Sequence, residues 1–76
     1  MRIISQTGDD IPYEGCALTI FGEFVYAAPI YNLENKFDVA SYSTPEKAEK
    51  AMQMLHNCYQ GALPNTIFRF PQEDEI

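Results

Sequence analysis

The chain is 76 residues long, 46% of its residues are hydrophobic, and eleven acidic residues against five basic ones give a formal net charge of −6. This length suits a single domain, 1–76, and the hydrophobic fraction predicts a folded rather than a disordered chain. The negative charge disfavours nucleic-acid phosphates and anionic membranes, so we expect no direct nucleic-acid binding and no membrane partner.

The N-terminal region has no apolar run of the length that a signal peptide needs, and no stretch of the sequence is long and apolar enough to cross a membrane. The cysteines are Cys16 and Cys58. In a chain without a secretion signal we expect them to be reduced and to pack as small hydrophobic side chains. The expected location is therefore the cytoplasm.

Short extended segments open the chain. Arg2–Gln6 is a β-type run, and Thr7–Asp10 follows it as a turn. The next segment, Ile11–Gly15, contains Pro12, which cannot donate a backbone hydrogen bond. This segment therefore suits an edge strand or a loop.

A β-hairpin is predicted next, because Cys16–Phe21 and Phe24–Ala28 are rich in β-branched and aromatic residues. Gly22–Glu23 separates them, and Gly in the first position of a two-residue connection indicates a type II′ turn. Leu18 and Ile20 would share one face. Both faces are apolar, so we expect one to remain uncovered and to cause self-association, most simply as a two-fold dimer. The candidates for the uncovered patch are Ala17, Thr19, Phe21, Val25 and Ala27, or their alternates.

Another strand is expected over Lys36–Tyr42, and a helix from about Thr44 to Gln60. Thr44 is a good N-cap, and Pro45 suits the first helical position. Gly61 suits the C-terminal cap. The predicted apolar stripe of this helix consists of Ala48, Ala51, Met52, Leu55, Cys58 and Tyr59.

Thr66–Phe70 is expected to be the last strand, which Pro71 ends, and residues 72–76 a short mobile acidic tail. The complete pattern predicts an α+β domain. We expect a small antiparallel β-sheet with one helix packed on one face, in the order β-β-β-β-α-β.

No catalytic or metal-binding pattern is present. His56 and Cys58 are two positions apart and point in different directions on a helix, which excludes a Cys–His catalytic pair within it. The cysteines and the one histidine are too widely spaced for a zinc site, and Asp9, Asp10 and Glu14 lack the spacing of a calcium loop. We therefore expect no catalytic residue, no metal and no cofactor, in a chain that is not an enzyme.

Tyrosines and carboxylates in turns are the best candidates for a binding surface. The chain has five tyrosines and no tryptophan. Tyrosine side chains either straddle core and surface or form an aromatic contact surface, for a protein or for a stacked base. Tyr13 favours the second role, because Pro12 keeps it out of a regular buried strand. The candidate binding residues are Asp9, Asp10, Tyr13, Glu14 and Tyr31.

Four separated stretches carry a family resemblance, and they are MRIISQ (Met1–Gln6), PYE (Pro12–Glu14), YSTPEKAEKAMQML (Tyr42–Leu55) and FRFPQEDEI (Phe68–Ile76). Together they resemble a family of small proteins, without an assigned activity, carried by bacteriophages and mobile elements of Gram-positive bacteria. Pro45 departs from the family pattern, in which Glu is usual, and the link from helix to last strand is shorter than in many relatives. The resemblance implies a phage or mobile-element setting in a bacterial cytoplasm, and it transfers no site residue.

Two functions from different classes are compatible with these features. The first is a protein-interaction module that inhibits a host anti-phage defence system, which a contiguous acidic patch would support. The alternative is a small-ligand binder that sequesters a signalling nucleotide at a subunit interface. It would need tyrosine side chains to stack on the base and Arg2, Lys36 or Arg69 to converge near a pocket. The expected partners are thus a host protein, a second copy of the chain or a nucleotide.

Overall fold

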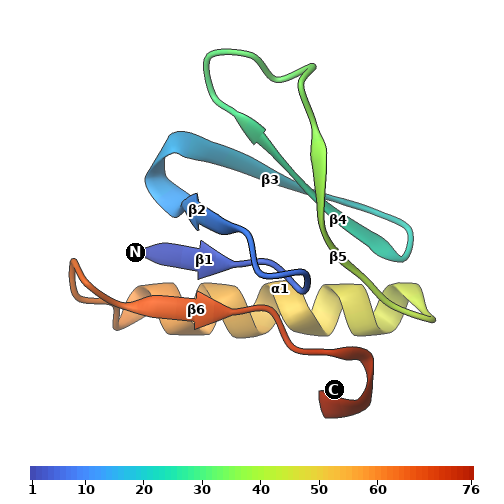
Figure 1. Cartoon of the computed structure of the whole chain (residues 1–76). Helices are drawn as coiled ribbons and strands as arrows, with labels where there is room; N and C mark the ends of the chain where they lie inside the picture. Colours follow the sequence, from blue (N-terminus) through green and yellow to red (C-terminus); the bar gives the residue numbers. More distant parts are fainter.

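The computed structural model describes all 76 residues and has an α+β fold (Figure 1). Five strands precede the α-helix in the chain, and one strand follows it. The strands are β1 (Arg2–Ile4), β2 (Asp10–Pro12), β3 (Cys16–Phe21), β4 (Phe24–Pro29), β5 (Phe37–Ser41) and β6 (Ile67–Arg69), the helix is α1 (Pro45–Gln60), and short 3-10 helices cover Tyr13–Gly15 and Glu73–Glu75.

The strands form two three-stranded sheets, in the orders β2-β1-β6 and β3-β4-β5. The first sheet is mixed, since β1 runs antiparallel to β2 and parallel to β6. The expected single antiparallel sheet in the order β-β-β-β-α-β is therefore corrected in strand number and in pairing. The additional strand is β2, in which Ile11 pairs with Ile3, and Pro12 is tolerated because β2 is an edge strand.

The hairpin between β3 and β4 forms as predicted, with a two-residue turn at Gly22–Glu23. Gly22 has a φ of +60°, and no residue other than glycine has a positive φ, which fits a type II′ turn. Phe21 pairs with Phe24 across this turn. The turn therefore fixes the register of the whole hairpin.

This register decides which side chains of the hairpin face the core. Ile20 pairs with Val25 and Leu18 with Ala27, and all four pack in or against the core. Val25 and Ala27 are fully buried, so their expected place in the uncovered patch is wrong. The opposite face carries Ala17, Thr19, Phe21, Phe24, Tyr26 and Ala28, of which Ala28 is nonetheless buried.

The helix α1 begins where the sequence predicts. Thr44 Oγ1 accepts a hydrogen bond from the Lys47 N–H at 3.3 Å, and Pro45 occupies the first turn. Met54 lies off the apolar stripe and is exposed. The buried part of the stripe consists of Ala48, Ala51, Met52 and Leu55, while Cys58 is half-buried and Tyr59 is exposed.

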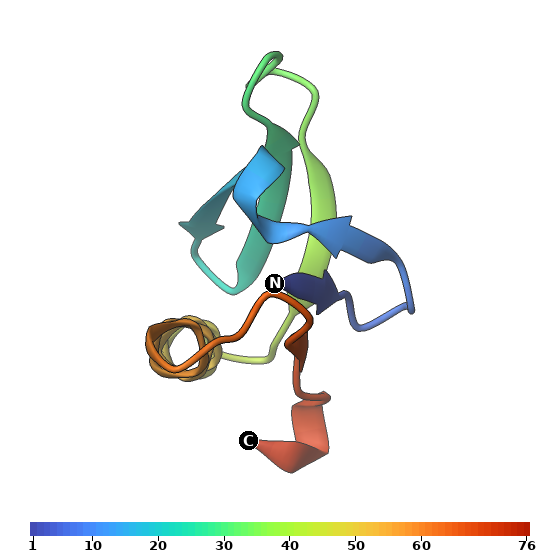
Figure 2. The ribbon, with the colours of Figure 1, turned by 90° about the vertical axis from the view of Figure 1, so that its left-hand side faces the viewer.

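One core joins both sheets to α1. Ile3 and Phe68 enter it from the first sheet, Val25 and Val39 from the second, and Leu55 from the helix. Figure 2 views α1 along its axis and shows β4 and β5 rising away from it to the loop that joins them.

Gln6 connects the first sheet, the second sheet and the C-terminal segment. Its N–H donates to the Val39 carbonyl at 2.9 Å, and its Oε1 accepts from the Ser41 N–H at 2.8 Å. Its Nε2 donates to the Pro71 carbonyl at 2.9 Å, and its own carbonyl accepts from Gln72 Nε2 at 3.0 Å. Gln6 therefore occupies the free edge of β5 and fixes the segment that follows β6, at Pro71 and Gln72.

Glu73 attaches the acidic tail to the start of α1. Its carboxylate accepts hydrogen bonds from the Ser43 N–H at 2.6 Å and the Ser43 Oγ at 3.2 Å, and it forms an ion pair with Lys47. The hydrogen bond from Lys47, followed by those from Ser43, holds the pKa of Glu73 below its usual value. The mobility that the sequence predicts for residues 72–76 stays a prediction.

The substitution Leu55→Ala should lower the free energy of unfolding by about 2–5 kcal/mol, because it removes a fully buried side chain from the core. The matched control Met54→Ala, one position earlier, changes an exposed side chain and should alter it by only about 0.5 kcal/mol. Urea unfolding of both purified variants gives the two values. A Leu55→Ala variant as stable as the Met54→Ala control would contradict the description of the core.

The contacts of Glu73 should make stability sensitive to acid. The pKa of Glu73 in the folded chain lies below its unfolded value of 4.5. The contribution of Glu73 to the free energy of unfolding is therefore complete above pH 4.5 and is lost as the pH falls through the folded-state pKa. Thermal melts across this range should therefore show a smaller loss of melting temperature for Glu73→Gln than for wild type. The control Asp74→Asn changes an exposed neighbouring carboxylate and should follow the wild type. Superimposable acid profiles of Glu73→Gln and wild type would be the contrary result.

Candidate functional site

The five candidate binding residues do not form one site. Asp9 accepts hydrogen bonds from the hydroxyls of Ser5 and Thr7 at 3.4 and 3.3 Å, in the turn between β1 and β2. Asp10 pairs with Arg2 at 2.8 Å across the same two strands. Both carboxylates therefore already have partners within this local structure.

Tyr31 lies far along the chain from the other candidates, in the loop between β4 and β5. Its side chain is 89% exposed, and Ile30 and Leu33 in the same loop are also exposed. Figure 1 shows this loop at the end of the second sheet that is remote from α1. The loop thus extends the apolar surface of the second sheet away from the body of the protein.

Tyr13 and Glu14 lie together just before β3. The ring centroids of Tyr13 and Tyr59 are 4.8 Å apart, in a tilted contact between the 3-10 turn and the end of α1. Burial, and then the charges of Tyr59 and Glu14, raise the pKa of Tyr13. The N-terminal ammonium of Met1 donates to both oxygens of Glu14, at 3.2 and 3.0 Å, and these hydrogen bonds lower the pKa of Glu14.

A groove of about 380 Å³ opens beside Tyr13, between β3 and α1. Its walls combine apolar and polar surface, and no Lys or Arg lines it. Sequence spacing identified Tyr13 and Glu14 but missed the rest of the lining, because strand and helix positions far apart in the chain meet only in the folded structure. The remaining lining residues are Cys16, Leu18, Met52, His56 and Tyr59.

The same groove contains a thiol and an imidazole, from Cys16 and His56. No hydrogen bond joins them, and both cysteines of the chain are free. No three side chains of the His, Cys, Asp or Glu type come together as a metal site. The groove is therefore a mixed surface of apolar side chains and tyrosines, with one carboxylate and one imidazole.

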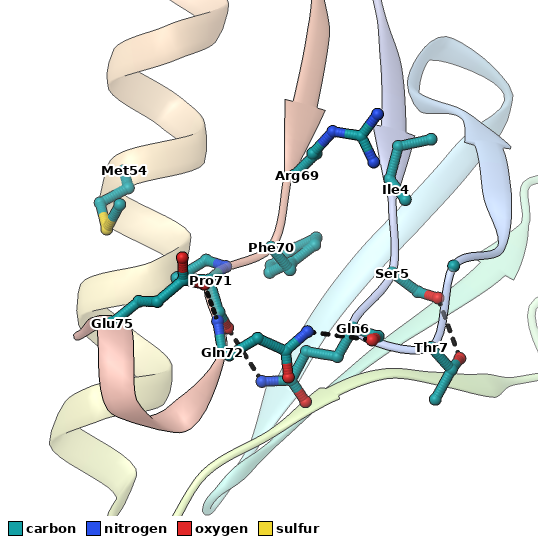
Figure 3. A pocket seen from close by; sticks show the side chains of 11 residues that line it. Ile4, Ser5, Gln6, Thr7, Met54, Arg69, Phe70, Pro71, Gln72 and Glu75 are labelled. Atoms are coloured by element: carbon teal, nitrogen blue, oxygen red, sulfur yellow. Dashed lines mark hydrogen bonds between the residues drawn. The ribbon is translucent and has the colours of Figure 1, made fainter.

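The largest hollow, of about 610 Å³, lies between β1, β6 and the C-terminal segment (Figure 3). Gln72 Nε2 bonds to the carbonyl of Gln6 there, and the hydroxyls of Ser5 and Thr7 are 3.1 Å apart. Arg69 is the one cation in its lining, and no tyrosine contributes to it. Its polar groups mainly connect the tail to the first sheet.

The tyrosines and cations that a nucleotide site would need do not converge. Arg2 and Arg69 share the outer face of the first sheet. Lys36 lies in the loop before β5. The contacting pair Tyr13 and Tyr59 lines the groove beside β3, which is a different hollow from that of Arg69.

The outer face of the second sheet carries three aromatic residues, Phe21, Phe24 and Tyr26, which we call the outer aromatic face. Phe21 is 74% and Phe24 40% exposed. The rings of Phe24 and Tyr26 stack with centroids 6.1 Å apart. Asp38 is the residue of β5 that pairs with Tyr26, and Glu23 lies in the hairpin turn, so carboxylates border the aromatic side chains.

Carboxylates also gather around the start of α1. The Tyr42 N–H donates to the Glu23 carbonyl at 3.0 Å, which brings the hairpin turn to this end of the helix. The bonds of Glu73 bring the tail to the same end. The hairpin turn with Glu23, the first helical turn with Glu46 and the tail residue Glu73 therefore meet at this end of the helix.

Searches of protein-family models, curated proteins and solved structures found no match to this chain. None of its helices combines the length and the apolar character that crossing a membrane requires. The resemblance to phage and mobile-element proteins therefore stays a prediction from the four sequence motifs.

Proposed function

We propose that this chain is a small, acidic, non-enzymatic binding protein whose main contact surface is the outer aromatic face. The observation that carries this proposal is the exposure of Phe21, 74% of whose surface is accessible, beside the half-exposed Phe24. Monomeric proteins rarely leave contiguous apolar patches in water. Aromatic side chains are enriched at the centres of protein interfaces, where they contribute much of the binding energy.

The charges around the outer aromatic face favour a basic protein as the partner. Asp38 lies beside Tyr26, Glu23 adjoins Phe24, and the whole chain carries a net charge of −6. A partner patch with an apolar centre and a Lys- and Arg-rich rim would complement this arrangement. Aromatic residues on a sheet can also stack RNA bases, but these carboxylates would repel the phosphates.

The family resemblance supplies the setting of the proposal. A phage or mobile element that expresses a small acidic protein in a bacterial cytoplasm gives it access to host proteins with basic surfaces. Nucleases of anti-phage defence systems have such surfaces, because they bind nucleic-acid phosphates. We therefore propose inhibition of a host defence protein as the function, supported by the carboxylates gathered around the start of α1.

Self-association is part of the same proposal. Without a host partner, the outer aromatic face should pair two copies of the chain as a two-fold dimer, the commonest closed arrangement. The host partner would then compete with the second copy for Phe21 and Phe24. The net charge of −6 on each copy weakens this dimer relative to a complex with a basic protein.

Sequestration of a signalling nucleotide at a subunit interface is the alternative function. It requires Tyr side chains and a cation at one site, whereas Arg69 and the Tyr13–Tyr59 pair line separate hollows. Only a dimer that brought these two hollows together would form such a nucleotide site. The protein-binding proposal needs no such rearrangement.

Affinity purification of the tagged chain from its bacterial host should recover one partner in a stoichiometric complex. Phe21→Ser should reduce the recovered partner by about tenfold or more, because the loss of one central aromatic contact typically exceeds about 1.4 kcal/mol. The matched control is Ile67→Ser, which changes a 55%-exposed apolar side chain on the other sheet. It should capture as much partner as the wild type.

Circular dichroism melts of both variants establish that each remains folded. Equal capture by Phe21→Ser and wild type, or loss of capture only in Ile67→Ser, would contradict the assignment of the contact surface. Millimolar nucleotides that compete for the partner would instead support the alternative function.

A further inference from the structure

The strand β3 has an unpaired outer edge. It pairs only with β4. The two residues that flank a two-residue hairpin turn, here Phe21 and Phe24, exchange backbone hydrogen bonds. Because bonded and non-bonded pairs alternate, Thr19 and Ala17 also bond to β4. The Ile30 N–H, which donates to the Gly15 carbonyl at 3.1 Å, continues this alternation. The backbone N–H and carbonyl groups of Leu18 and Ile20 therefore point away from β4, toward open space.

The other sheet edges offer fewer free backbone groups to an added strand. The edge of β5 is occupied by Gln6, which bonds to Val39 and Ser41. The edge strands of the first sheet, β2 and β6, have only three residues each. The six-residue strand β3 is thus the longest unprotected edge in the molecule, and such edges readily accept another strand.

The groove between β3 and α1 runs beside this open edge. Leu18 and Ile20 point to the inner side of the sheet and pack against the core. Leu18 also lines the groove, opposite Met52 and His56 of α1. An antiparallel strand added to β3 would bond to Leu18 and Ile20 through the directly opposite residues, whose side chains point to the same inner side. Those side chains would enter the groove.

The lining of the groove defines the occupant. Leu18 and Met52 on its facing walls suit aliphatic side chains at alternate positions of an extended peptide. Its one carboxylate, Glu14, is already paired with the Met1 ammonium, and His56 lies on the opposite wall. The net charge of −6 on the whole chain favours a peptide whose remaining side chains, outside the groove, are basic.

We propose that β3 and the adjacent groove bind an extended basic segment of a partner protein by β-strand addition. Backbone hydrogen bonds to Leu18 and Ile20 give affinity, and alternate apolar side chains in the groove give specificity, as in other domains that bind peptides at a sheet edge. This inference rests on the proposed protein-binding function, but it uses the edge and the groove instead of the outer aromatic face.

Fluorescence anisotropy with a labelled peptide of about seven alternating Lys and Val residues tests the proposal. The control peptide has the same sequence with backbone N-methyl groups on the Val residues, whose N–H groups would face β3. Saturable binding of the first peptide, weakened about tenfold or more by N-methylation, is the expected result. Equal binding of both peptides means non-specific charge attraction, and it overturns strand addition.

A pair of adjacent helix substitutions locates the site. His56→Lys places a cation in the groove, whereas Asn57→Lys makes the same change of charge at an exposed position outside the lining. His56→Lys should weaken peptide binding about tenfold, and Asn57→Lys by much less. Equal effects of the two substitutions would overturn the assignment of the groove.

The same measurements separate this inference from the proposed function. Phe21→Ser should lose the host partner yet retain the peptide, because Phe21 lies outside the groove. Light scattering reports the oligomeric state of each variant. If wild type and Phe21→Ser are dimers and His56→Lys is a monomer, a second copy of the chain occupies the β3 edge. That outcome overturns the proposal of a basic peptide.

Discussion

One helix has to cover two separate sheets, and the rest of the structure depends on this constraint. Leu55 packs in one core with Ile3 of the first sheet and Val25 of the second. Ala48 and Ala51 are fully buried, and their small side chains let the helix lie close to the strands. Because α1 has only one apolar stripe, it can cover only the inner side of each sheet. Phe21 and Phe24 on the outer face of the second sheet and Ile67 on that of the first remain exposed.

The two outer faces differ in chemistry, and the proposed binding surface rests on this difference. The first sheet presents Arg2 and Arg69 together with the single exposed apolar residue Ile67. The second presents two adjacent exposed aromatic residues, Phe21 and Phe24. The strand β3 borders both proposed contact surfaces, because its outer face carries Phe21 and its edge adjoins the groove that Leu18 lines. One partner could therefore cover a continuous surface with an apolar centre, a strand edge and acidic surroundings.

The sequence predicts those parts of the fold that local signals determine. The helix follows from Thr44, Pro45 and its apolar stripe, and the hairpin follows from Gly22. The division into two sheets depends on the parallel pairing of β1 with β6, which joins the two ends of the chain and has no local signal. The same limit applies to the site, because Tyr13 and Glu14 stand out in the sequence, whereas the groove exists only once His56 of α1 faces β3.

Amide hydrogen exchange at single-residue resolution tests the central claim, that the packing of α1 leaves the edge of β3 open. The N–H groups of Leu18 and Ile20 point away from β4 and should exchange rapidly in the isolated protein. The Thr19 N–H bonds to β4, so its exchange requires opening of the hairpin and should be slow. Addition of the basic peptide should then slow exchange at Leu18 and Ile20. Protection of Leu18 and Ile20 equal to that of Thr19 before any peptide is added would contradict the account, since the edge would already be paired.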